Sequence, residues 1–301
     1  MDQPIKQKNL ERILKKNDLN EFLGNYKTRI EIRDLCLNIL GTQTFSAMGI
    51  KQDKSFLLYG DPGLGKTYAI SCIEGELEKR NHKTFVLDYT IGTHGTAYIN
   101  MGSVNLQKFF DKGINMLSND KIGLDSIIYV FDECESLMGK RGLKHNKEDD
   151  KLLNTLMLNL QMIHNTYDPE YVIFMTNHIK DIDEAAIRSG RIDRKIEFKY
   201  PNFNERKESF KYSINSINKK AKYNVIKTYD LNELAKHSKG FNCADCIEIP
   251  KRAVRKKALE VVRIGKYQNM NNNYIKHKKL LKMVKNQKKD YLTTRKQKIG
   301  F

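Results

Sequence analysis

The feature that constrains this chain most is residues 60–67, which read Gly-Asp-Pro-Gly-Leu-Gly-Lys-Thr. This is a complete phosphate-loop pattern, in which a glycine and four variable residues precede Gly-Lys and a serine or threonine. The apolar run from Ser55 to Tyr59 comes directly before it, and Ile70, Ile73 and Leu77 follow it at helical spacing. The motif requires a strand before and a helix after, so the sequence predicts binding of a nucleoside triphosphate.

Each part of the phosphate loop has its own chemical role. The glycines let successive backbone N–H groups surround the phosphates, and the helix that follows presents the positive end of its dipole. Lys66 is expected to reach the β- and γ-phosphates, and the Thr67 hydroxyl is expected to bind Mg²⁺. The predicted nucleotide-binding residues of the loop are Gly60, Asp61, Pro62, Gly63, Leu64, Gly65, Lys66 and Thr67.

Length and composition favour a globular protein of one or two domains. The chain has 301 residues, of which 40% are apolar, enough to bury a full core. No window approaches the roughly 18 apolar residues of a membrane span, and residues 1–16 alternate charged and apolar positions. The five cysteines are an odd number without a secretory context, which indicates free thiols. We therefore expect a soluble intracellular protein of the cytoplasm, with no transmembrane segment.

The positive charge of the chain is concentrated at its C-terminal end. The formal net charge is +18, and residues 251–301 contain 17 Lys or Arg against only Glu260 and Asp290. Such a segment can neutralise the phosphates of nucleic acid or an acidic protein surface. A solvated basic end without a partner is an equally good interpretation of the charge alone.

Helices alternating with buried strands predict an α/β fold with a parallel sheet. Residues 126–131 and 171–176 are uninterrupted apolar runs, which are typical of strands buried on both faces. Residues 83–88 form a third β-rich run, and residues 104–117 have helical spacing. Beyond Pro201 the pattern becomes helical, with predicted helices at residues 205–214, 231–237 and 244–262.

Two acidic residues, Asp132 and Glu133, follow the buried run at residues 126–131. Open α/β sheets bind ligands at the carboxyl ends of their strands, which is where these carboxylates are predicted to lie. Asp132 is expected to hold Mg²⁺, and Glu133 to orient and polarise the attacking water. Capping of the next helix is the structural alternative.

Polar residues follow the next buried run as well. Asn177 comes directly after residues 171–176, where a neutral donor can hold the attacking water or the γ-phosphate. A simple turn residue is the alternative.

Arg188 and Arg191 flank a glycine before a predicted edge strand at residues 195–198. Arginine at such a place can stabilise the charge of the transition state, whereas a surface salt-bridge set is the structural interpretation.

Five segments resemble the motifs of the AAA ATPase family, in the same order and with similar spacing. They read GDPGLGKT, IIYVFDE, MTNH, AAIRSGRIDR and GFNCAD, and the resemblance extends over about residues 20–260. It implies that the nucleotide is ATP and that Asn177 is the residue the family calls sensor 1. It also implies that Arg188 and Arg191 act on the nucleotide of a neighbouring subunit. The expected assembly is therefore a homo-oligomer, a hexameric ring.

The sequence pattern, together with the resemblance, predicts a division of the chain into four parts. A short segment at residues 1–20 precedes the ATPase core at residues 21–201, a P-loop NTPase parallel sheet sandwiched by helices. A small all-helical lid domain follows at residues 202–265, and a basic C-terminal tail at residues 266–301. The GFNCAD segment, residues 240–245, resembles the element at which the family's helical domain closes over the nucleotide.

Tyr98 and Ile99 occupy the place of the family's pore loop, whose aromatic residue grips an extended polypeptide. A packed loop tyrosine is the alternative, and Asn100 and Met101 replace the glycine and the acidic residue usual in the family.

The resemblance implies ATP-driven disassembly or unfolding of an unknown protein client, recruited directly or by an adaptor. The alternative is a nucleic-acid-associated ATPase, such as a helicase or clamp loader, that uses residues 251–301.

Overall fold

A computed structural model describes residues 17–89, 101–139, 147–188, 190–264 and 274–299. By its own contacts the chain divides into two compact units. The first unit comprises the described residues up to Phe22 together with Ile32–Tyr59 and Thr67–Ile196. The second comprises Leu23–Glu31, Gly60–Lys66 and the described residues from Glu197 onward.

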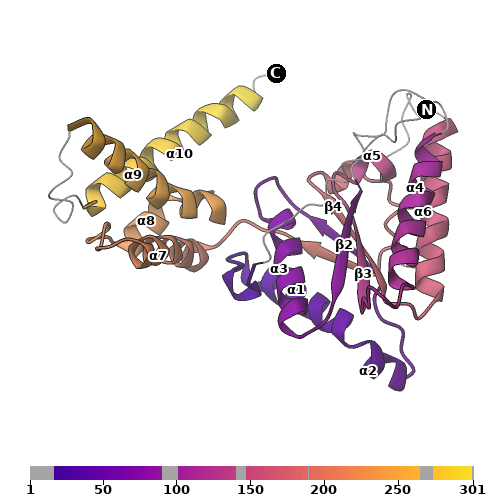
Figure 1. Cartoon of the computed structure of the whole chain (residues 1–301). Coiled ribbons are helices and arrows are strands. Elements are labelled where there is room, and N and C mark those ends of the chain that lie inside the picture. Colours follow the sequence, from indigo (N-terminus) through magenta and orange to yellow (C-terminus); the bar gives the residue numbers. More distant parts are fainter. Residues whose placement is uncertain (1–16, 90–100, 140–146, 189, 265–273, 300–301) are drawn as a thin grey trace, which may run out of the picture. The chain divides into compact units, whose positions relative to one another are not determined.

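The first unit is built on a five-stranded sheet (Figure 1). Its strands lie in the order β2-β3-β4-β1-β5 and are β1 (Ser55–Tyr59), β2 (Thr84–Tyr89), β3 (Ser126–Phe131), β4 (Glu170–Thr176) and β5 (Arg194–Glu197). Strands β1 to β4 pair in parallel. The strands predicted at residues 55–59, 126–131 and 171–176 are confirmed, and the parallel α/β class is confirmed with them.

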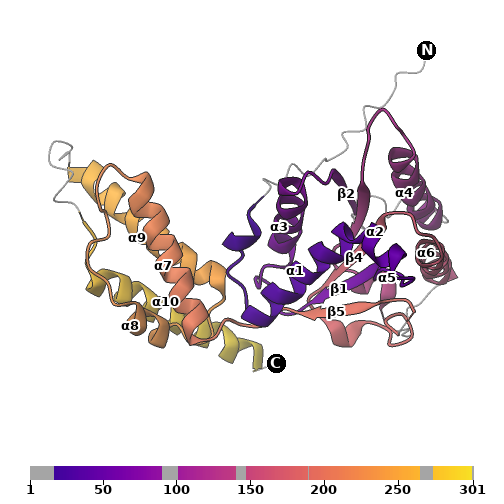
Figure 2. The same ribbon diagram turned by 90° about the horizontal axis from the view of Figure 1, so that it is seen from below.

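Helices cover both faces of this sheet (Figures 1 and 2). The part of α1 from Ile32 lies with α3 on one face, and α4 lies with α6 on the other. The helices are α1 (Tyr26–Leu40), α2 (Thr42–Ala47), α3 (Lys66–Lys79), α4 (Met101–Leu117), α5 (Glu135–Met138) and α6 (Lys147–Asn165), with short 3-10 turns η1 (Leu19–Glu21) and η3 (Ile179–Asp181). The helices predicted after the phosphate loop and at residues 104–117 are present as α3 and α4.

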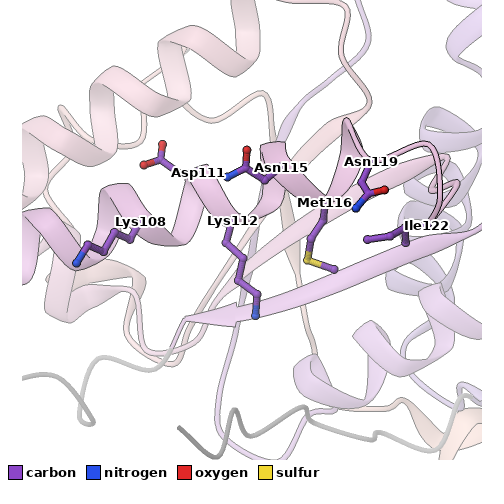
Figure 3. A pocket seen from close by; sticks show the side chains of 7 residues that line it. All are labelled: Lys108, Asp111, Lys112, Asn115, Met116, Asn119 and Ile122. Atoms are coloured by element: carbon purple, nitrogen blue, oxygen red, sulfur yellow. The ribbon is translucent and has the colours of Figure 1, made fainter. Parts of the chain in front are cut away.

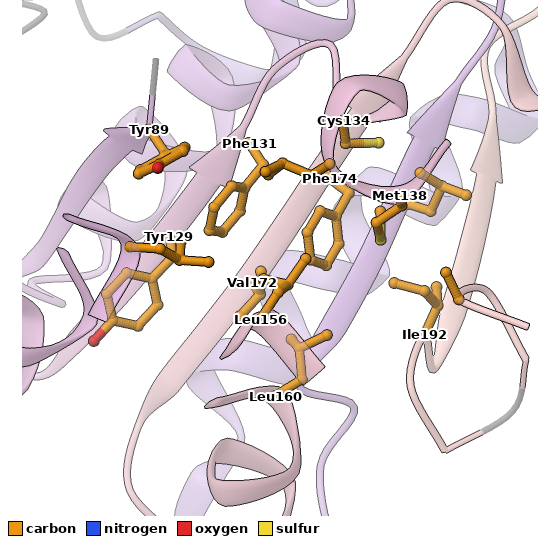
Figure 4. Packing of buried hydrophobic residues seen from close by; sticks show 14 of the residues in the cluster. Tyr89, Tyr129, Phe131, Cys134, Met138, Leu156, Leu160, Val172, Phe174 and Ile192 are labelled. Atoms are coloured by element: carbon orange, nitrogen blue, oxygen red, sulfur yellow. The ribbon is translucent and has the colours of Figure 1, made fainter. Parts of the chain in front are cut away.

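A large apolar cluster fills the space between the sheet and α4 and α6 (Figure 4). The rings of Phe131 on β3 and Phe174 on β4 stack with their centroids 5.1 Å apart. Leu156 and Leu160 of α6 belong to the same cluster. Every residue of β3 is buried, which explains why its sequence is apolar without interruption.

One polar pair is buried inside this core and depends on a glycine. The Tyr129 hydroxyl donates to Glu170 at 2.6 Å, and burial raises the pKa of the Glu170 carboxyl. A Cβ at Gly113 of α4 would lie 2.1 Å from the Tyr129 hydroxyl and 2.5 Å from its ring. The helix can approach the sheet this closely only because position 113 has no side chain.

The second unit contains four helices among its described residues from Glu197 onward: α7 (Phe203–Lys220), α8 (Leu231–His237), α9 (Cys243–Ile264) and α10 (His277–Ile299). They include the three that the sequence predicts, at residues 205–214, 231–237 and 244–262. Asn202 and Glu205 form a capping box at the start of α7. The core of these helices includes Phe210, Phe241 and Leu280, all buried. Within the described parts of both units, no helix is long and apolar enough to cross a membrane.

Candidate nucleotide-binding site

The phosphate loop leaves the end of β1 and leads into α3, as the sequence predicts. Gly60, Gly63 and Gly65 have φ angles of +145°, +78° and +96°, which side-chain-bearing residues rarely adopt. A Cβ at Gly60 would also lie 2.3 Å from the carbonyl oxygen of Phe198. These backbone angles and this close approach explain why the loop needs glycine at positions 60, 63 and 65.

Lys66 and Thr67 form the first turn of α3, directly after the loop. The Lys66 ammonium is buried and donates to the carbonyl oxygens of Gly60 at 2.6 Å and Asp61 at 3.2 Å. The first backbone N–H groups of a helix have no partner within it, and the helix dipole is positive at that end. An ammonium beside such a helix start is well suited to bind phosphate.

Parallel pairing brings the ends of three strands to one edge of the sheet. Tyr59 at the end of β1 is opposite Thr176 at the end of β4, and Phe131 at the end of β3 is opposite Phe174. The phosphate loop, the Asp132-Glu133 pair and Asn177 directly follow β1, β3 and β4, respectively. The sheet therefore aligns the predicted catalytic groups along the edge where α/β proteins bind their ligands.

Asp132 and Glu133 are exposed at the end of the fully buried β3. Glu133 has a φ of +51°, an uncommon angle for a residue with a side chain. Its N–H group donates to Asp132 Oδ1 at 3.0 Å, and the N–H of Cys134 donates to the Met175 carbonyl at 3.0 Å. The turn that carries the two carboxylates is thus fixed to the neighbouring strand β4, and strain of this kind clusters at functional sites.

The two predicted arginines lie on one turn between η3 and β5. Arg188 and Arg191 are both exposed, and the Arg191 N–H donates to the Arg188 carbonyl at 3.1 Å. Arg191 Nη1 donates to the carbonyl of Ala185 at 2.7 Å, and Gly190 has a φ of +88°. The turn therefore presents two guanidinium groups at the surface of the first unit.

Comparison with known proteins shows which family has this combination of a phosphate loop, paired carboxylates and arginines. The family described as "ATPase family associated with various cellular activities (AAA)" matches residues 56–200, which include the phosphate loop, the Asp132-Glu133 pair, Asn177 and both arginines. The chain belongs to the AAA family of ATPases. Its AAA domain binds ATP with Mg²⁺ and hydrolyses it, as the sequence predicts.

Curated relatives of this AAA ATPase include proteases and proteasome components. The chain is 31% identical to the ATP-dependent zinc metalloprotease FtsH 2 of Thermoanaerobacter sp. over 75% of its own length and 39% of the relative's. It is 30% identical to the 26S proteasome regulatory subunit 8 homolog of Encephalitozoon cuniculi, over 80% of its length and 59% of that protein. It is 29% identical to the proteasome-activating nucleotidase of Archaeoglobus fulgidus, over 80% and 58%. The chain thus spans 39 to 59% of the length of these relatives.

A half-buried ionic cluster that the sequence does not reveal fixes the turn that carries Arg188 and Arg191 to β1. Asp193, two residues after Arg191, accepts at Oδ2 from the N–H groups of Lys54 at 2.7 Å and Ser55 at 3.0 Å. His164, at the end of α6, lies with Nε2 at 2.9 Å from the same oxygen. The β1 strand therefore carries the phosphate loop at one end and holds the arginine turn at the other.

His164 is held between two acceptors. Its Nδ1 is 2.7 Å from the carbonyl oxygen of Leu160, which can only accept, so that nitrogen carries a proton. The hydrogen bond to Asp193 raises the pKa of His164, and the nearby Lys54 ammonium partly opposes this. Burial acts to raise the pKa of Asp193, but hydrogen bonds from His164 and the backbone outweigh it, so that pKa is lowered. Both groups favour their charged forms.

Within the second unit, the start of α9 touches the phosphate loop. A Cβ at Gly63 would lie 2.8 Å from Asn242 Nδ2. Asn242 also accepts from the Asp245 N–H at 2.7 Å, and its own N–H donates to the Asp245 carboxylate at 3.2 Å. The GFNCAD segment, residues 240–245, therefore forms a capped helix start beside a phosphate-loop glycine.

Two features lie away from this site. Tyr98 and Ile99, the predicted pore-loop residues, fall outside the described residues. A pocket of about 490 Å³ is lined by Lys108 and Lys112 of α4 and by Ile122 (Figure 3). Ile122 precedes the amino end of β3, so this pocket lies at the end of that strand opposite to Asp132 and has no part in ATP binding.

Proposed function

We propose that this AAA ATPase uses ATP hydrolysis to unfold or disassemble protein clients as a homo-oligomeric ring, most simply a hexamer. The observation that carries the proposal is that the phosphate loop, the Asp132-Glu133 pair and Asn177 directly follow parallel strands whose carboxyl ends meet at one sheet edge. The exposed Arg188 and Arg191 add to it. Support also comes from the relatives, whose names place them in ATP-dependent proteolysis and in the proteasome.

The proposed roles follow from chemistry and position. Lys66 and the loop N–H groups bind the phosphates, while Thr67 and Asp132 hold Mg²⁺. Glu133 polarises the attacking water, and Asn177 holds that water or the γ-phosphate in place. The AAA module would extend over residues 21–201, with residues 202–265 as its lid.

Arg188 and Arg191 complete the site of the neighbouring subunit in this proposal. Both guanidinium groups are exposed on their own chain, which leaves them accessible to a second copy. An arginine supplied in trans stabilises the charge of the transition state and is worth about 10³ to 10⁵ in rate. Hydrolysis would then require assembly, which explains the expectation of a ring.

Tyr98 and Ile99 would grip the client inside the ring. An aromatic ring can pack between the side chains of an extended polypeptide whatever its sequence, so the client is defined by its accessibility and not by a motif. The client would be recruited by other parts of the chain or by an adaptor protein.

The test is to use the Glu133→Gln protein as a trap in a lysate of its native source. This variant is expected to bind ATP without hydrolysing it, so it holds its client. Proteins captured in ATP but not in ADP, and retained after nuclease treatment, would support remodelling of protein. Capture that disappears with nuclease would refute it and favour the nucleic-acid-associated alternative.

A further inference from the structure

The solvent-facing side of α10 carries a regular stripe of lysines. We propose that this stripe, with the adjacent cations of α9, binds the phosphodiester backbone of nucleic acid without regard to sequence. The inference concerns binding by the second unit and does not depend on how the AAA domain acts on protein. It rests on the helical spacing of the α10 lysines, on their exposure to solvent and on the few carboxylates near them.

The stripe is defined by spacing. Lys278, Lys282, Lys285 and Lys289 are separated by four, three and four residues, which places them on one face of a helix, and all four are exposed. The opposite face contains Leu280 and Val284, which are fully buried in the core of the second unit. At about 1.5 Å per residue the stripe extends over about 16 Å.

The charge of the stripe is poorly neutralised by the rest of the unit. Among the described residues, Lys278, Lys282 and Lys285 form no ion pair, and Asp290 is the one acidic residue in the sequence of α10. Glu260 of α9 is already bound to Lys279 at 2.9 Å. Three of the four cations therefore remain available for anionic groups from another molecule.

Helix α9 widens this basic surface. It packs against α10 with the opposite chain direction, because Glu260 binds Lys279 near one end of the contact and Arg252 binds Gln287 near the other. The two helices cross in Figure 1. Residues 251–264 of α9 contain six Lys or Arg against Glu260 alone. The cations Lys251, Lys256 and Arg263 of this helix are exposed. Cations therefore outnumber carboxylates on the exposed parts of the two helices.

The partner that fits this surface best is a nucleic-acid backbone. A duplex carries one charge per about 1.7 Å of its axis, counted over both strands, so about nine phosphates lie within about 16 Å of duplex and several cations of the stripe can contact phosphate in any register. Membrane-binding helices instead expose large apolar side chains beside their cations. In the described part of α10, Leu281 and Met283 pack against the core and do not form such a face. Among the described residues of this pair of helices, the exposed large apolar side chains, Leu259, Val262 and Ile264, are confined to the end of α9. Contacts from lysine to phosphate do not distinguish one base sequence from another. Binding through this stripe is therefore expected to be independent of sequence.

The experiment measures binding of the full chain to a labelled 30-base-pair DNA duplex of arbitrary sequence by fluorescence anisotropy at several salt concentrations. The test variant changes Lys278, Lys282, Lys285 and Lys289 to Gln together. The control makes the same change at four exposed lysines of the first unit, Lys112, Lys121, Lys180 and Lys195. Both variants lose the same net charge, so the comparison isolates position from total charge.

Loss of the three phosphate contacts expected from Lys278, Lys282 and Lys285 should reduce the slope of log affinity against log salt by about 2.7, with affinity at least about tenfold weaker at 100 mM salt. The control variant should bind like the wild type. Substitution of the four stripe lysines by Arg should restore binding, which separates loss of charge from a folding defect. The ATPase rate without nucleic acid should be unchanged in all variants.

Two results would overturn the proposal. One is equal slope and affinity of the stripe variant and the wild type. The other is lysine-dependent binding to vesicles with 30% phosphatidylserine, or to polyglutamate, that is tighter than binding to the duplex at equal salt. Either of these ligands would then be the partner in place of nucleic acid. Because the assay needs no ATP, its failure is distinguishable from failure of the remodelling function.

Discussion

Replacing Asp193 by Asn tests whether the ionic cluster holds the arginine turn to β1. The change keeps the shape of the side chain and removes its charge. Asp193 and His164 have side-chain exposures of only 18% and 17%, so solvent screens their interaction weakly. Asn therefore weakens the bonds from Lys54 N–H, Ser55 N–H, the Ser55 hydroxyl and the His164 ring at once.

The magnitude of the effect on stability follows from these four bonds. A hydrogen bond to a charged group contributes about 1.5–3 kcal/mol and a neutral one about 0.5–1.5 kcal/mol, so each loses about 1 kcal/mol. We expect Asp193→Asn to lower the free energy of unfolding by about 2–3 kcal/mol at pH 6, allowing for incomplete additivity. The Arg188 and Arg191 turn should loosen as a result, and ATP hydrolysis should decrease with it.

The pH dependence provides a sharper test of this cluster than the size of the effect. The pKa of His164 is raised in the folded state, so its contribution is complete below the unfolded value of about 6.5 and is lost as pH rises through the folded pKa. The pKa of Asp193 is lowered, so its contribution is present above about 3.9 and is lost only in more acidic solution. The cost of Asp193→Asn should therefore be about 1 kcal/mol smaller at pH 9 than at pH 6.

Urea denaturation at both pH values measures this difference. His164→Gln is the matched control, because without the imidazole the cost of Asp193→Asn should no longer depend on pH over this range. Titration of the His164 ring by NMR gives an independent measurement. An equal cost at pH 6 and pH 9, or an ordinary pKa for His164, would refute the reasoning.

Three further predictions concern single residues. Lys66→Ala should abolish ATP binding, measured by calorimetry, because it removes the phosphate-binding ammonium; retained affinity would contradict the loop assignment. Glu133→Gln should still bind ATP but hydrolyse it about 10² to 10⁴ times more slowly, and a normal turnover would mean that another group positions the water. Gly113→Ala should lower the free energy of unfolding by about 1–3 kcal/mol, since its Cβ would overlap the buried Tyr129 ring, despite a gain of up to about 1 kcal/mol in helix propensity. The same change at Gly102 of α4, where a Cβ has ordinary contacts at 3.8 Å, should not destabilise the protein, so equal effects at the two glycines would contradict this explanation.

The chemistry of the AAA domain could be predicted from the sequence because each of its parts is local. The phosphate loop needs glycine where φ is positive, and the carboxylates and Asn177 follow strands that their apolar runs already identify. Parallel pairing then brings these strand ends to one edge, which is a general property of α/β sheets. The predicted edge strand is also present, as β5 next to β1.

Other parts of the fold were not predicted, for two different reasons. Helix α6 has Leu153, Leu156 and Leu160 at helical spacing, so the periodicity of its apolar residues does indicate a helix. The contact between His164 and Asp193 has no local signal, because 29 residues separate the two and the sheet brings them together. The positive φ of Glu133 likewise occurs in a turn that the N–H of Cys134 fixes to β4, and such a contact has no local signal in the sequence.

The most direct test of the central claim mixes two inactive variants. Arg188→Ala combined with Arg191→Ala keeps the ATP site but lacks the arginines, whereas Glu133→Gln keeps the arginines but lacks the residue that activates water. If the arginines act on a neighbouring subunit, an equal mixture should recover about a quarter of the wild-type ATPase rate, the fraction of interfaces that join an intact site to intact arginines. A mixture as inactive as either variant alone would contradict hydrolysis at a shared interface.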